Sequence, residues 1–231
     1  PQWWVSDENT PEGEEGLNNY EADFLRKQLE RNQLGQIKFS YNKILNSNQG
    51  KALVDNLPNL MSNQFNAIVY NFVDMLSHAR TDMQMIKELA PDDAGYRSIT
   101  RSWLLHSPLM DLLKKIADKK CRVVITTDHG MIRVQKPVKI VGYRETNTNL
   151  RYKHGKNLGF GDDHIFVCRK PERFFLPKPH VSTAYVFAEE DYFFAYPNNY
   201  NQYVNLYRDT FQHGGVSMEE MIIPFIGLRG K

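Results

Sequence analysis

Five aspartate and histidine side chains of this 231-residue chain are of the types that bind metal ions, and each stands close to an apolar segment. They are Asp74, His78, Asp128, His129 and His213. Three of these carboxylate and imidazole groups can converge on one site, and an adjacent Asp-His pair can serve another. Such a mixture of ligands suits a borderline divalent ion such as Zn²⁺ or Mn²⁺.

Two nearly continuous apolar segments are expected to position these groups. Residues 65–73 and 121–126 are rich in β-branched residues, which is typical of strands buried on both faces. Residues 96–119 between them form the pattern of one long amphipathic helix. A strand, helix and strand in this order predict a right-handed crossover in a parallel sheet. Ligands of such sheets gather at the carboxyl ends of the strands, where Asp74 and Asp128 stand.

The remaining segments complete the pattern of one α/β domain, residues 1–231, with an acidic irregular lead-in at 1–16. Composition and spacing predict helices at 17–34, at 50–61 with an interruption by Pro58, at 200–211 and at 218–221, and strands at 37–45, 181–187, 192–195 and 222–228.

Each motif also has an ordinary structural interpretation. An isolated Asp-x-x-x-His often lies on a solvated helix face, Asp128 can cap the turn after its strand, and His-Gly-Gly is commonly a turn. The order and placement of the three motifs together favour the metal site. His164 beside Asp162-Asp163 is expected to make a loop hydrogen bond instead.

A basic stretch after the Asp128-His129 segment has two equally weighted interpretations. Its side chains can bind phosphate, since arginine forks do so with two hydrogen bonds, or they can form a solvated β-hairpin. The candidates for substrate binding are Arg144, Asn147, Arg151 and Lys153.

Charge and composition exclude several classes of protein. The formal net charge of +2 is too balanced for bulk binding of long nucleic acids, so a small substrate is favoured. No apolar segment approaches the roughly 18 residues of a membrane helix. Cys121 and Cys168 are expected to be reduced residues of a cytoplasmic protein. The start at Pro1 is expected to mark a piece of a longer protein.

The ordered motifs resemble those of the alkaline phosphatase superfamily. These are Asp74-Met75-Leu76-Ser77-His78, Thr126-Thr127-Asp128-His129-Gly130 and His213-Gly214-Gly215. The segment 211–224 is similar to the terminal signature of the PglZ branch, and residues 148–153 with Trp3-Trp4 resemble PorX-type response regulators, which carry a PglZ output domain.

The resemblance implies an alkaline-phosphatase-like α/β fold with a central, mainly parallel sheet flanked by helices. Asp74, His78 and His213 would hold one zinc ion, and Asp128 with His129 would hold a second, with manganese as the other candidate metal. The superfamily's nucleophile and one further ligand match nothing in this chain. The resemblance therefore implies an incomplete C-terminal portion, whose N-terminal strand and nucleophile segment lie upstream.

The resemblance further implies a metal-dependent phosphodiesterase output domain acting on small nucleotide or cyclic or linear oligonucleotide phosphodiesters. Two metals about 3.5–4 Å apart suit this chemistry because they stabilise both the attacking and the leaving oxygen. The implied partners are an upstream receiver domain, a second copy, a sensor kinase and the transcription machinery, without a membrane.

A second hypothesis is a non-catalytic, metal-stabilised signalling and dimerisation module that controls type IX secretion. A weaker third one is a phosphomutase or sulfatase relative, although neither cysteine stands in a sulfatase-type motif.

Overall fold

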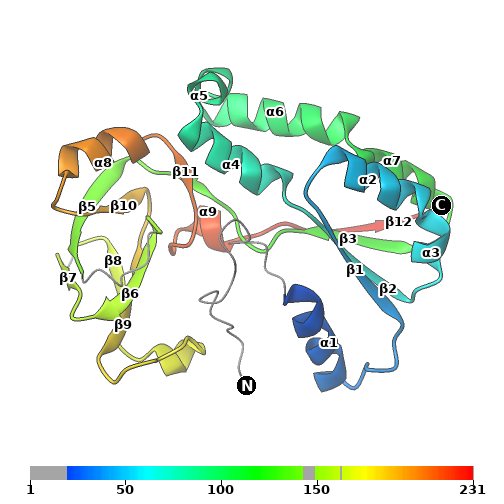
Figure 1. The fold of residues 1–231 in the computed structure, drawn as a ribbon, viewed down its shortest axis with the longest axis horizontal. Helices are drawn as coiled ribbons and strands as arrows, with labels where there is room; N and C mark the ends of the chain where they lie inside the picture. Colours follow the sequence, from blue (N-terminus) through cyan, green and yellow to red (C-terminus); the bar gives the residue numbers. More distant parts are fainter. Residues whose placement is uncertain (1–19, 143–148, 162, 231) are drawn as a thin grey trace. The chain divides into compact units, whose positions relative to one another are not determined.

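The computed structural model describes residues 20–142, 149–161 and 163–230 of the chain, so the lead-in at 1–16 lies outside it. Figure 1 draws the helices and strands along the chain. The described residues fall into two compact units, one within 1–72 and 107–112 and the other within 73–106 and 113–231. It mixes helices with several small sheets, as the α/β class requires.

The first unit is built on a parallel pair of strands. β1 (Phe39–Ile44) pairs with β2 (Phe65–Tyr70), with Phe39 opposite Phe65. The helices between these strands are α2 (Ser47–Asp55) and α3 (Leu57–Met61), and α1 (Glu21–Arg31) precedes β1. The Asn46 side chain accepts a hydrogen bond from the Gln49 amide and caps α2, which begins three residues before the predicted start.

Four helices follow β2, and they differ from the predicted pattern in two ways. They are α4 (Phe72–Asp82), α5 (Gln84–Leu89), α6 (Asp93–His106) and α7 (Pro108–Ala117). Helix α4 begins at Phe72, so Asp74 lies in its first turn rather than at a strand end. The single long helix predicted at 96–119 is wrong, because Pro108 cannot donate an amide hydrogen bond and the chain breaks at Ser107.

The second unit contains the other strands, which form small, separate ladders. β3 (Arg122–Thr126) pairs antiparallel with β12 (Phe225–Arg229), and β4 (Ile132–Arg133) pairs antiparallel with β11 (Phe211–Gln212). Strands β2 and β3 belong to different units, each described by itself, so the predicted crossover between them stays a prediction.

Two three-stranded sheets surround the main core of this unit. One has the order β10 (Tyr192–Ala195), β5 (Lys136–Val141), β7 (Gly159–Phe160), and the other has the order β6 (Tyr152–Lys156), β9 (Thr183–Ala188), β8 (Ile165–Cys168). Their inward side chains form a buried cluster of Ile140, Ile165, Val186, Ala188 and Phe194.

Three short helices complete the second unit. A 3₁₀ helix spans Pro171–Phe174, α8 spans Tyr200–Tyr207 and α9 spans Met218–Met221. Helix α8 ends before the predicted limit at 211, because the chain continues into β11. Among the described residues, no helix is long and apolar enough to cross a membrane.

Candidate metal centre

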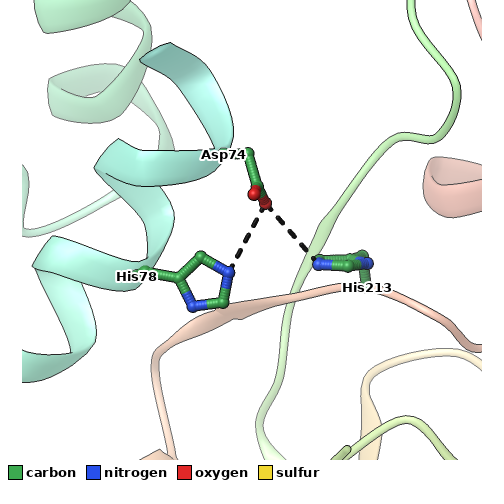
Figure 2. Close-up of side chains that lie close together, drawn as sticks. All are labelled: Asp74, His78 and His213. Atoms are coloured by element: carbon green, nitrogen blue, oxygen red, sulfur yellow. Dashed lines mark ion pairs between the residues drawn. The ribbon is translucent and has the colours of Figure 1, made fainter. Parts of the chain in front are cut away.

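Asp74, His78 and His213 come together at one point in the second unit, and Figure 2 shows the carboxylate between the two imidazoles. Asp74 and His78 lie one helical turn apart on α4 and therefore share a face. The Asp74 Oδ1 atom lies 3.6 Å from His78 Nε2 and 3.6 Å from His213 Nε2. One ligand atom of each residue lies within 4.8 Å of the others.

The Asp74 Oδ1 atom is buried, and the described residues give it no hydrogen-bond partner. Both imidazole nitrogens are too distant for a hydrogen bond, which needs about 2.7–3.2 Å. Atoms bound at about 2.0–2.1 Å to a tetrahedral Zn²⁺ lie roughly 3.3–3.5 Å from one another, close to the two 3.6 Å separations observed. The buried oxygen and the spacing therefore fit a shared metal ion better than a hydrogen-bonded cluster.

Asp128 and His129, the two residues predicted to hold the second metal ion, have different surroundings. The His129 ring stacks on the His213 ring with centroids 3.9 Å apart and planes at 12°. The Asp128 side chain, by contrast, is 88% exposed, with His129 Nε2 3.9 Å from its Oδ2 atom. The structure thus places His129 against His213, while the Asp128 side chain next to it is exposed.

The protonation of His129 and of His213 suits metal binding. His129 Nδ1 lies 2.9 Å from the Gly130 carbonyl oxygen, which can only accept, so Nδ1 carries the proton and Nε2 keeps the lone pair that a metal ion would take. Burial, and then the charge of His129, lower the pKa of His213. A neutral imidazole is the form that binds a metal.

A buried aromatic pair links the first turn of α4 to β11. The Tyr96 hydroxyl donates a 2.7 Å hydrogen bond to the carbonyl of Val73, next to Asp74. Burial, followed by the charge of Asp74, raises the pKa of Tyr96 to about 12, so the hydroxyl stays a donor. The Tyr96 ring packs at 4.5 Å on Phe211, two residues before His213.

Buried Arg80 makes a second connection between the same two elements. Its guanidinium donates to the carbonyls of Ala90, Pro91 and Asp209. The guanidinium carbon also lies 5.0 Å from the centre of the Phe211 ring. Because Arg80 stands two residues after His78, it holds the end of α4 against the strand that leads to His213.

The segment that follows His213 is held by the buried Glu220 carboxylate. Glu220 accepts hydrogen bonds from the amides of Gly215 (2.9 Å) and Ser217 (3.1 Å). Arg151 donates to the same carboxylate through Nε (2.8 Å) and Nη2 (2.6 Å), and its side chain is 0% exposed. Burial alone would raise the pKa of Glu220, but these hydrogen bonds and the Arg151 charge outweigh it and lower the pKa.

The two glycines after His213 have separate structural reasons. Gly214 has φ of +104°, a conformation that side-chain-bearing residues rarely adopt. A Cβ on Gly215 would lie 2.6 Å from the Ala188 oxygen and 2.6 Å from Arg151 Nη2. The Gly-Gly pair therefore lets the chain turn against the buried Arg151–Glu220 pair.

Of the four candidates for substrate binding, the two that the structure describes have buried contacts in the second unit. Arg144 and Asn147 lie outside the described residues. Arg151 is buried on Glu220, and Lys153 is buried with its ammonium 4.7 Å from the centre of the Tyr196 ring. Burial lowers the pKa of Lys153 to about 8. His164, expected to make a loop hydrogen bond, stacks on Tyr192 at 4.1 Å and accepts one from the Glu189 amide through its carbonyl oxygen.

Sequence patterns do not point to Arg80, Tyr96 or Glu220 as supports of the site. They also do not point to the stacking of His129 on His213. Only Glu220 carries a local signal, because Ser217-x-x-Glu220 is a capping box, with both hydrogen bonds present at the start of α9. Arg80 and Tyr96 act through contacts with residues distant in the sequence, for which spacing gives no signal.

One family model covers nearly the whole chain. It is the BREX system PglZ alkaline phosphatase-like domain, which matches residues 6–228. No curated protein matches the chain.

Proposed function

The chain belongs to the PglZ family of alkaline phosphatase-like domains, and from this premise we propose that its metal centre hydrolyses phosphodiesters. The observation that carries the proposal is the buried Asp74 Oδ1 atom, which has two imidazole nitrogens at 3.6 Å and, among the described residues, no hydrogen-bond donor. We further propose small nucleotide or oligonucleotide phosphodiesters as the substrates.

Asp74, His78 and His213 would hold the first metal ion, and His129 with Asp128 would hold the second. A bound divalent ion supplies a Lewis acid for a phosphoryl oxygen and lowers the pKa of a water molecule or hydroxyl group. Zinc suits the donor set of one carboxylate and two imidazoles.

The residues around these ligands support the proposal by fixing their orientation. Tyr96 and Arg80 hold α4 against β11, and the Arg151–Glu220 pair holds the turn after His213. Groups that position metal ligands in this way commonly change metal affinity by about 10–100-fold when they are removed. Arg144 and Asn147 are proposed to position the phosphate, with the nucleophile supplied by the segment upstream.

We also propose that the domain is the output module of a cytoplasmic PorX-type response regulator, with a receiver domain upstream and a sensor kinase and the transcription machinery as partners. The alternative function, a scaffold for dimerisation in type IX secretion control, is favoured by one observation. Strand β12 exposes large apolar side chains, with Phe225 76% and Ile226 48% exposed. Such a strand is suited to being covered in an assembly.

The test compares this chain with a longer protein that includes the upstream segment, both loaded with zinc. The longer protein should hydrolyse bis-nitrophenyl phosphate, and His213→Ala in it should abolish turnover. His106→Ala is the matched control, because His106 is exposed on α6 and its Nδ1 atom contacts only its own helix at Ser102. Equal turnover in all variants, or none in the zinc-loaded longer protein, contradicts the proposed function.

A further inference from the structure

A large cavity opens beside the segment that follows His213, and the proposed hydrolysis gives it no role. Its volume is about 1080 Å³, at the upper end of the range for sites that bind small organic molecules. Its wall is formed by Ile132 of β4, by side chains of β8, β9 and the 3₁₀ helix, and by the segment 215–219 with Met221. All of these residues belong to the second compact unit.

The floor of the cavity is aromatic. Phe166 and Phe187 lie opposite each other on β8 and β9, with ring centres 6.2 Å apart. The Phe174 ring meets Phe166 edge-on at 6.0 Å, and it is 55% exposed. Covering an exposed phenylalanine ring with an apolar ligand is favourable, because it removes apolar surface from water.

The cavity lining also includes carboxylates. Asp191 lies 2.9 Å from the Lys136 ammonium, which is the only cationic group among the described lining residues. Glu189, Glu190 and Glu219 line the same cavity and give it a net negative charge. A phosphate group would be repelled here, so the cavity complements a cation.

We propose that this cavity binds an organic cation with an aromatic or aliphatic body. The faces of aromatic rings attract such cations, and the attraction strengthens when the cation leaves water. The three carboxylates add the matching charge, and the phenylalanine floor takes up the apolar body. This ligand site goes beyond the proposed hydrolysis, and it requires neither a metal ion nor turnover.

An occupant of the cavity would contact the chain that positions the metal centre. Gly215 and Ser217 line the cavity, and their amides donate to Glu220. Gly215 stands two residues after His213, so the wall lies within about 7 Å of the His213 backbone along the chain. An occupant of the cavity would therefore contact the segment that leads from His213 to Glu220.

Isothermal titration calorimetry on this chain tests the proposal with three probes that share one aromatic body. They are benzyltrimethylammonium, benzyl alcohol and benzenesulfonate, which are cationic, neutral and anionic. The cation should bind most tightly and the anion least. Glu190→Gln, Glu219→Gln and Phe174→Ala should each weaken binding of the cation by about fivefold. The matched control is Glu30→Gln, which makes the same change of charge on the exposed face of α1.

Three results would overturn the proposal. They are benzenesulfonate binding as tightly as the cation, unchanged affinity in the three cavity variants, and absence of binding by the cation in a folded protein. None depends on phosphodiesterase activity. A failure of the cavity proposal is therefore distinguishable from a failure of the proposed function.

Discussion

Replacing Arg151 by methionine should destabilise the second unit strongly, because it leaves the Glu220 carboxylate buried without its cation. The two side chains are 0% and 2% exposed and are joined by hydrogen bonds of 2.6 and 2.8 Å. Removing one partner of such a buried pair costs about 3–5 kcal/mol. After the substitution, the carboxylate keeps only the amides of Gly215 and Ser217 among its described donors.

The measurement is urea unfolding followed by circular dichroism, with Arg26→Met as the matched control. Arg26 pairs with Asp23 at 3.9 Å on α1, where both side chains are more than half exposed, so its loss should cost less than about 1 kcal/mol. Glu220→Gln should also be strongly destabilising, because it leaves the Arg151 guanidinium, which is 0% exposed, buried without its anion.

The same variant should also weaken zinc binding. The Arg151–Glu220 pair holds the turn after His213, and loss of a group that orients a metal ligand lowers affinity by about 10–100-fold. Competition with a chromogenic zinc chelator measures this change. The reasoning is refuted if Arg151→Met unfolds like Arg26→Met, or if it loses stability and keeps wild-type zinc affinity.

Three further predictions concern the metal centre and its surroundings. His78→Ala should lose bound zinc while His106→Ala keeps it, and equal metal content by elemental analysis would exclude His78 as a ligand. Tyr96→Phe should lower the free energy of unfolding by about 1 kcal/mol in urea titrations, because the carbonyl of Val73 loses its donor, and an unchanged midpoint would contradict this. Burial lowers the pKa of Lys153 from 10.5 to about 8, so between these values the unfolded chain binds a proton that the folded chain lacks. The free energy of unfolding should therefore rise with pH over that window by up to about 3 kcal/mol, and Lys153→Met should remove the rise; a wild-type slope in that variant would show that another group titrates.

The convergence of Asp74 and His78 follows from the sequence because it depends on local spacing. Asp74 and His78 stand four residues apart, which places them on one face of any helix. His213 was identified by its place before a Gly-Gly turn and a strand, and the structure contains both features. The strand predicted at 121–126 is confirmed as β3, but its antiparallel partner β12 lies about a hundred residues further on, where spacing carries no information.

The groups that hold the ligands could not be predicted in the same way. Arg151 and Glu220 are separated by 69 residues, and each alone has the composition of a surface charge. The pair stabilises the fold because both side chains are buried. Their burial depends on the packing of β6 and β9, which lie far from Glu220 in the sequence. The break of the predicted long helix at Ser107 is different, since Pro108 is visible in the sequence and restricts the residue before it.

A metal ion held by His78 and His213 would have a role in folding because of where these residues stand along the chain. His78 lies near the beginning of the second unit and His213 near its end, so an ion bound to both closes a loop that contains all its sheets except β3–β12, whose β12 strand follows His213. Closing a long loop removes conformational entropy from the unfolded chain, as a disulfide does. The small ladders inside this loop, including the two-residue strands β4 and β11, would then gain stability from this cross-link.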